Sequence, residues 1–93
     1  MPLSFEWDPD KARANLAKHG IAFEEAATLF GDGRALTIPD PVHSLTEVRF
    51  ITMGISCNRQ ILVAVHTDRG DNIRIISARR AGRKERRRYE EIS

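Results

Sequence analysis

Residues 60–81 read QILVAVHTDRGDNIRIISARRA, and this stretch decides the fold. Residues 60–67 are strongly apolar and residues 72–81 are rich in β-branched side chains, a composition that favours strands. The intervening DRGD segment is typical of a tight turn, because Gly70 supplies a positive φ angle at little cost. The pattern therefore predicts two long antiparallel strands, with the second strand broken by Gly82 before a helix over residues 83–92.

Shorter elements are predicted upstream of this hairpin. Residues 47–56 are expected to form a strand that turns at residues 57–59, and residues 34–38 a strand stopped by Pro39. Residues 42–46 are expected to form a loop. Residues 3–7 alternate apolar and polar side chains like a short half-buried strand, with Phe5 and Trp7 directed to the core.

Two helices are predicted between the first strand and the meander. Asp8 as N-cap, Pro9 at the first helical position and Gly20 as left-handed C-cap predict a helix over residues 9–19. Its apolar positions, Ala12, Leu16 and Ala17, make only a thin stripe. A second helix over residues 23–30 places Phe23, Ala26, Ala27 and Phe30 at helical spacing, although Ala22 cannot cap it. The expected fold is α+β, in the order β-α-α-β-β-β-β-α, with an antiparallel meander carrying helices on one face.

Length and composition limit the possible classes of protein. The 93 residues fit one domain, residues 1–93, with 41% hydrophobic and 30% charged side chains. Neither a secretory signal nor an apolar run of about 20 residues occurs in the sequence. The lone Cys57 cannot form an internal disulfide, so a reducing, cytoplasmic location is expected and no role in membranes. The sequence contains neither zinc-ligand spacing nor a glycine-rich phosphate loop, so no metal and no cofactor is expected.

Positive charge is concentrated near the C-terminus. Residues 69–88 carry nine basic and two acidic side chains, a local charge of +7, whereas the rest of the chain carries −5. Such segregation indicates a polyanionic or acidic partner, and a solvated helix face is the alternative interpretation. Residues 83–92 offer apolar surface only at Tyr89 and Ile92, so this helix is expected to lack an anchor of its own and to fray without a partner.

Several short motifs occur together in an order that resembles a known family. They are FEWD at residues 5–8, NLAKHG at 15–20, FEEA at 23–26, EVRF at 47–50, HT at 66–67, RIISARR at 74–80 and ER at 85–86. In this order and spacing, over nearly the whole chain, they resemble the BrnT toxins of bacterial toxin–antitoxin operons. The resemblance implies a RelE-like fold and a ribonuclease activity that arrests growth. It also implies a BrnA-type antitoxin in a two-plus-two complex, which binds operator DNA through the antitoxin.

Candidate site residues follow from the chemistry of metal-independent RNA cleavage, which needs a base, an acid and cations at the phosphate. The candidates for catalysis are His66, Glu47, Arg49, Arg79 and Arg80. The candidates for RNA binding are Lys18, His19, Arg74, Arg83, Lys84 and Arg87, and those for antitoxin binding are Arg83, Arg87 and Tyr89. Strand alternation predicts that Arg74 and Arg80 share one face of the sheet, with Arg79 on the other.

Each candidate also has a structural interpretation. His66 ends an apolar strand and is equally typical of a buried, hydrogen-bonded histidine, while Glu47 and Arg49 have the spacing of a structural ion pair. Lys18 and His19 complement a helix C-terminus whatever else they do. The leading interpretation is an RNA endonuclease toxin. The alternative is a non-catalytic basic module that recruits an acidic protein or nucleic acid.

Overall fold

The structure, a computed structural model, describes residues 3–41 and 47–92 and has a mixed α+β fold, as predicted. The expected loop at residues 42–46 lies outside the described residues. The five strands are β1 (Ser4–Glu6), β2 (Leu36–Pro39), β3 (Phe50–Ile55), β4 (Ile61–Arg69) and β5 (Asn72–Arg80). The helices are α1 (Pro9–His19), α2 (Phe23–Thr28) and α3 (Arg83–Ile92), and a short 3-10 turn, η1 (Leu29–Gly31), follows α2.

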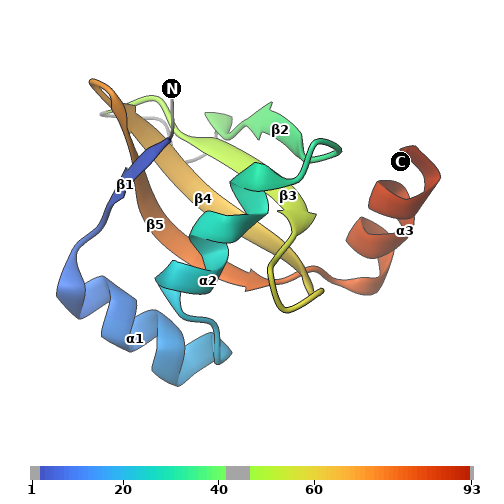
Figure 1. Ribbon diagram of the computed structural model, residues 1–93, viewed down its shortest axis with the longest axis horizontal. Helices are drawn as coiled ribbons and strands as arrows, with labels where there is room; N and C mark the ends of the chain where they lie inside the picture. The colour runs from blue at the N-terminus through green and yellow to red at the C-terminus, as the bar shows by residue number, and fades with distance from the viewer. Residues whose placement is uncertain (1–2, 42–46, 93) are drawn as a thin grey trace.

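The strands form one sheet in the order β1-β5-β4-β3-β2 (Figure 1). Strands β2 to β5 run antiparallel to their neighbours, whereas β1 lies parallel to the first residues of β5. The hairpin between β4 and β5 turns at Gly70, whose φ of 60° is the predicted left-handed conformation. The parallel edge strand could not be read from the sequence, because local alternation does not specify a strand's partner.

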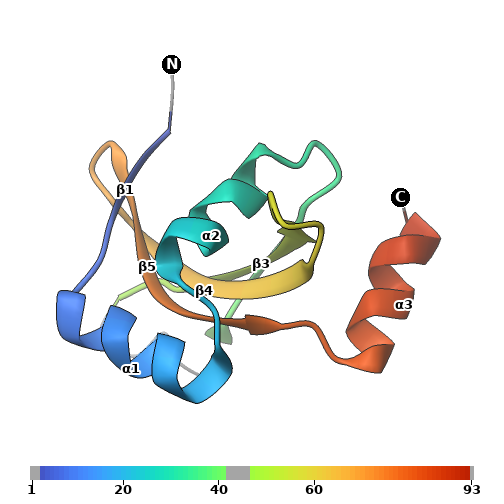
Figure 2. The same ribbon diagram turned by 60° about the horizontal axis from the view of Figure 1, so that its bottom comes forward.

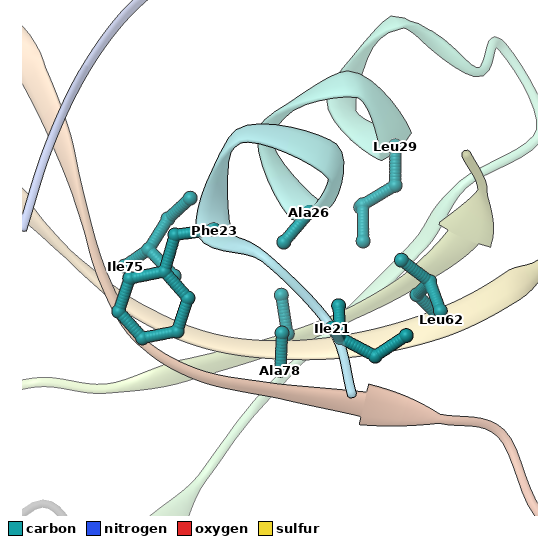
Figure 3. Packing of buried hydrophobic residues seen from close by; sticks show 8 residues of the cluster. Ile21, Phe23, Ala26, Leu29, Leu62, Ile75 and Ala78 are labelled. Atoms are coloured by element: carbon teal, nitrogen blue, oxygen red, sulfur yellow. The ribbon is translucent and has the colours of Figure 1, made fainter. Parts of the chain in front are cut away.

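Helix α2 and the turn η1 cover one face of the sheet, which we call the helix side, and α1 lies beside the edge of β5 (Figures 1 and 2). Here Phe23, Ala26 and Leu29 descend from α2 and η1 onto the sheet, and Ile21 fills the space beside them (Figure 3). Their partners on the strands are Leu62, Ala64, Ile75 and Ala78. Phe5 and Trp7 pack against the same cluster, as predicted.

Helix α1 docks mainly through a polar residue, and its apolar stripe contributes little. Asp8 and Gly20 cap the helix as predicted, but Leu16 is 51% exposed and Ala17 also faces solvent. The buried residue of α1 is Asn15, whose side-chain amide donates to the carbonyl oxygens of Ile21 and Ala78 and accepts from the Ala78 amide. Of the thin apolar stripe only Ala12 packs against the core, so Asn15 makes the main attachment of this helix.

The opposite face of the sheet, which we call the open side, carries Leu36, Ile38, Ile51, Met53 and Val63. Helix α3 borders this face beyond the end of β5, apart from α1 and α2 (Figures 1 and 2). Together these side chains and Glu85 and Arg88 of α3 line a groove of about 280 Å³. One face of the sheet is thus closed by helices, and the other is partly open.

Helix α3 has an anchor, so the expectation that it lacks one is wrong. Tyr89 is only 7% exposed and packs with Met53, Val63 and Ala81. Its hydroxyl donates to Asp32, and this hydrogen bond raises the pKa of Tyr89. The prediction failed because Asp32, in a glycine-flanked turn, gave no sign that it would meet a residue 57 positions later.

We expect Tyr89→Phe to loosen α3 without unfolding the sheet. The change removes one hydrogen bond to a carboxylate, which lowers the free energy of unfolding by roughly 1.5–3 kcal/mol. Hydrogen exchange measures the local effect, and α3 amides are expected to exchange faster in the variant. Unchanged exchange of α3 in a variant of unchanged stability would contradict an anchoring role for the Tyr89–Asp32 bond.

Candidate nucleic-acid interface

The predicted basic candidates fall into two groups at opposite ends of the sheet. Arg79 and Arg80 lie where β5 ends and lead into the cations of α3, whereas Arg49 and Arg74 lie near the other end. Arg69, which was not among the candidates, lies at that other end too. Along β4, Arg80 lies opposite Leu62 and Arg74 opposite Thr67, and this separation of five residues corresponds to about 17 Å at a rise of roughly 3.3 Å per residue. The catalytic set proposed from the sequence is therefore not assembled at one point. We call the two places the Arg80 end and the Arg74 end.

Arg80 is held at the sheet end by residues from three elements of the chain. Its Nε donates to Gln60 Oε1 at 2.8 Å, and its Nη1 donates to the carbonyl oxygen of His19 at 3.3 Å. Gln60 in turn donates to Glu25 Oε2 at 2.8 Å, and Ser56 donates to the same oxygen at 2.7 Å. Burial raises the pKa of Glu25, but these hydrogen bonds outweigh it and the net direction is downward, so the carboxylate stays ionised. The guanidinium of Arg80 is thus fixed in place before any ligand arrives.

Arg79 has a different environment, because its guanidinium already holds a carboxylate. Its two terminal nitrogens donate to the two oxygens of Glu85 at 2.7 and 2.9 Å. The hydrogen bond raises the pKa of Arg79 and lowers that of Glu85. Glu85 also accepts from the Gly82 amide at 2.8 Å, which joins the first turn of α3 to β5. The Arg79 guanidinium, which was predicted to bind phosphate, is therefore already engaged in an internal ion pair with Glu85.

Arg74 lies on the open side with Arg79, and the prediction that it shares a face with Arg80 is wrong. The register of β4 and β5 shifts next to His66, where one residue of β5 bulges. Ile75 and Ala78 both face the helix side although they are three residues apart, so alternation is interrupted between them. Arg74 donates to Glu6 on β1 at 2.7 Å, and Asn72 also donates to Glu6. These hydrogen bonds lower the pKa of Glu6.

Glu47 and Arg49 precede β3, which begins at Phe50, so the predicted strand starts too early. The Glu47 carboxylate lies 3.8 Å from Arg49 Nε and 3.4 Å from Arg69 Nη2. The ion pair with Arg69 connects the segment before β3 to the end of β4. The carboxylate is thus flanked by two arginines at the Arg74 end. This arrangement fits the structural interpretation of the pair.

His66 is enclosed on the helix side and is 5% exposed. Its ring stacks on Phe50 with centroids 5.8 Å apart and meets Phe30 edge-on at 4.9 Å. Its Nε2 lies 2.7 Å from the Thr52 hydroxyl, which is 2.8 Å from that of Thr37. Burial lowers the pKa of His66, partly offset by Asp68, so the ring is neutral at physiological pH. The enclosure of the ring and its contacts favour the structural interpretation of His66, and its role as a catalytic acid or base stays a prediction.

We expect stability to fall between pH 7.5 and 5.5 because of His66. The folded-state pKa lies below the ordinary 6.5, so the unfolded chain binds the proton more readily. The contribution of neutral His66 to the free energy of unfolding is therefore complete above about pH 6.5. It is lost as the pH falls through the folded-state pKa of this residue. Urea unfolding at both pH values is expected to show a smaller loss for His66→Gln than for wild type, with His19→Gln as control. An identical loss in all three proteins would contradict this account.

The remaining candidates lie on or next to the Arg80 end. Lys18 and His19 form the last turn of α1, and the His19 carbonyl contacts Arg80. Arg83, Lys84 and Arg87 are exposed on α3. Tyr89 is buried against the protein's own sheet, and its contact with an antitoxin stays a prediction.

Asn15, Gln60 and Asp32 position this region and were not recognised from the sequence as site residues. Asn15 fixes α1, Gln60 holds Arg80, and Asp32 holds Tyr89. Only Asn15 had a signal in the sequence, because it is a polar residue in a predicted helix, residues 9–19, that has few apolar residues. Over residues 3–41 and 47–92, no group of three His, Cys, Asp or Glu side chains is arranged to hold a metal ion. Within the same ranges no helix is both long and apolar enough to cross a bilayer.

Comparison with known proteins identifies the family. The family model described as the ribonuclease toxin BrnT of type II toxin–antitoxin systems matches residues 7–85. No curated protein matches the chain. A crystal structure of the Brucella abortus ribonuclease toxin BrnT superposes with a TM-score of 0.68 at 22% identity, over 88% of this chain and all of that one. The fold is therefore that of the Brucella toxin, and the family match covers most of the sequence. The chain belongs to the BrnT family of ribonuclease toxins, and as a type II toxin it has an antitoxin partner.

Proposed function

We propose that this ribonuclease cuts RNA at the Arg80 end of the sheet. The observation that carries the proposal is the fixed guanidinium of Arg80, held by Gln60 and the His19 carbonyl beside the cationic helix α3. In the proposed reaction the 2′-hydroxyl gives its proton to water and attacks the neighbouring phosphodiester, so that no metal is required to supply the nucleophile. A 2′,3′-cyclic phosphate forms, and the departing 5′ oxygen takes a proton from water. Arg80 stabilises the charge that accumulates on the phosphate as the bond to the 5′ oxygen breaks.

The proposed RNA path crosses Lys18 and His19 at the end of α1 and Arg83, Lys84 and Arg87 on α3. The exposure of these α3 side chains supports this path, because solvated cations engage a polyanion without losing an internal partner. Arg79 serves as the residue that joins α3 to β5 through Glu85. His66, Glu47 and Arg49 take no part in the proposed reaction, because His66 is enclosed and the Glu47–Arg49 pair belongs to the Arg74 end.

The antitoxin proposal uses the open side of the sheet. We infer a BrnA-type antitoxin that lays apolar side chains in the groove lined by Leu36, Ile51 and Met53 and acidic side chains along α3, covering the RNA path. Ile38, 54% exposed at the rim of this groove, supports an apolar contact. The proposed assembly is a two-plus-two complex that binds operator DNA through the antitoxin. The proposed fold relationship is to the RelE toxins, and the proposed location is the cytoplasm.

Reversing Arg83 and Arg87 together is expected to weaken the antitoxin complex more than either single reversal. The two side chains lie four residues apart on one face of α3, so both meet the same acidic surface. Affinity is also expected to fall as salt rises, because exposed charge pairs are screened within about 10 Å at 0.1 M salt. Titration calorimetry at two salt concentrations measures both effects. An affinity unchanged by salt and by the double reversal would place the antitoxin elsewhere.

Induced expression of the chain without its antitoxin tests the proposed function. We expect bacterial growth to stop and cellular RNA to be degraded over the same interval. Co-expression of the antitoxin is the control and is expected to restore both growth and RNA integrity. Growth arrest with intact RNA would contradict RNA cleavage and would support the non-catalytic binding module instead.

A further inference from the structure

A basic cavity of about 300 Å³ lies at the Arg80 end, and residues from three separate parts of the chain line it. Arg59 comes from the turn between β3 and β4, Arg80 from the end of β5 and Arg86 from α3. Gln60 and Glu90 also line it, so the cavity brings three guanidinium groups together against one carboxylate. A concave site with a charge of +2 suits an anion.

Arg59 adopts a conformation that arginine seldom takes. Its φ is 61°, the one positive φ outside glycine in the described part of the chain. The Arg59 amide donates to the Ser56 carbonyl and the Ser56 amide donates to the Gln60 carbonyl, which closes a tight hairpin turn. Glycine or asparagine is the ordinary choice at such a left-handed position. An arginine there costs conformational energy, and its side chain is thereby presented to the cavity.

The three arginines differ in how they are held. Arg80 is fixed by Gln60 and the His19 carbonyl. Arg59 and Arg86 are exposed, and the side chain of neither forms a hydrogen bond or ion pair with another residue of the ranges 3–41 and 47–92. One guanidinium is therefore preorganised, and two flexible ones lie at the rim of the cavity, free to close on a ligand.

We propose that Arg59, Arg80 and Arg86 form a phosphodiester-binding pocket that seats the RNA backbone next to Arg80. The proposal rests on the proposed function, since it names the contacts that position the substrate of that site. Planar guanidinium groups bind phosphate oxygens through paired N–H donors, which suits a strand phosphate that offers two non-bridging oxygens. The negative charge of Glu90 repels an anion and so lowers the affinity of the pocket for free inorganic phosphate.

The decisive variants are Arg59→Gly and Arg86→Gln, compared with Arg88→Gln. Arg88 lies on the same helix and carries the same charge, but it lines the groove of the open side. The probe is a single-stranded RNA with 2′-O-methyl groups, which cannot be cleaved by 2′-hydroxyl attack. We expect each pocket variant to weaken RNA binding by about tenfold. We also expect the slope of log K against log salt to shrink by about 0.7 for one lost phosphate contact. Arg88→Gln is expected to change both the RNA affinity and its salt dependence less than the pocket variants do.

Folding is controlled within the same set of proteins. Arg59→Gly is expected to melt at or above the wild-type temperature, because glycine relieves the positive φ. If Arg59→Gly and Arg86→Gln both bind RNA like Arg88→Gln, the pocket assignment is wrong, and wild-type cleavage would show that the ribonuclease proposal survives. If wild type neither binds nor cleaves RNA, both proposals fail.

A second titration separates strand phosphate from free phosphate. Inorganic phosphate is added at constant ionic strength, and we expect it to bind far more weakly than the RNA and to lose affinity in the same two variants. Variants that weaken inorganic phosphate but leave RNA affinity unchanged would overturn the assignment, because the pocket would then take a free anion.

Discussion

Replacing Arg80 by alanine is expected to slow RNA cleavage by about 10- to 150-fold, which corresponds to the 1.5–3 kcal/mol of a charge-assisted hydrogen bond. Arg80→Lys is expected to recover only part of this loss, because an ammonium group keeps the charge but not the planar fork. Initial rates on a single-stranded RNA measure the effect. In a cell, the alanine variant is expected to lose its toxicity.

The matched control for Arg80→Ala is Arg13→Ala, which removes one positive charge from an exposed side chain of α1 that pairs with Asp10. Its cleavage rate is expected to stay close to that of wild type. Thermal unfolding of all three variants shows whether a slow enzyme is still folded. A folded Arg80→Ala protein that cleaves at the wild-type rate would remove Arg80 from the reaction.

Replacing Asn15 by alanine is expected to lower the free energy of unfolding by about 2–4 kcal/mol, a large share of the stability of a domain this small. Strand β1 covers β5 only at residues 72–74, so the edge of β5 beyond them needs another partner. Asn15 provides it, because its carboxamide both donates to and accepts from the backbone of Ala78. The alanine variant leaves these groups buried and unpaired.

Thermal or urea unfolding measures the loss at Asn15, and Leu16→Ala is the control on the neighbouring residue. Leu16 is 51% exposed, so its truncation is expected to change the free energy of unfolding by about 0.5 kcal/mol or less. Equal stability of the two variants would contradict the bridging role of Asn15.

The sequence predicted the elements of this fold better than their contacts. Capping by Asp8 and Gly20, the turn at Gly70 and the apolar strand β4 are local signals, and each has its expected place. The bulge in β5 has no local signal in the sequence. Because it interrupts the alternation of side chains, the face predicted for Arg74 was wrong. Its cause lies in the pairing with β4, which a single strand's sequence does not encode.

The candidate site shows the same division. Charge alone located the cationic end of the chain, and Arg80 and the cations of α3 lie there. Charge could not show that Glu85 occupies Arg79 or that Asp32 reaches Tyr89, since both contacts depend on the path of the chain after β5. His66 was ambiguous for a related reason. The same residue type serves catalysis or a buried hydrogen bond, and only its enclosure by Phe30 and Phe50 distinguishes the two.

The central claim is that RNA lies at the Arg80 end rather than at the Arg74 end, and NMR mapping with the uncleavable RNA tests it most directly. We expect backbone amide shifts on titration to concentrate at residues 18–19, 59–60, 80–81 and 83–87, with little change at residues 47–49 and 69–74. Shifts confined to residues 47–49 and 69–74 would contradict the account, because they would place the substrate about 17 Å or more from Arg80 along the sheet, beyond the reach of its side chain.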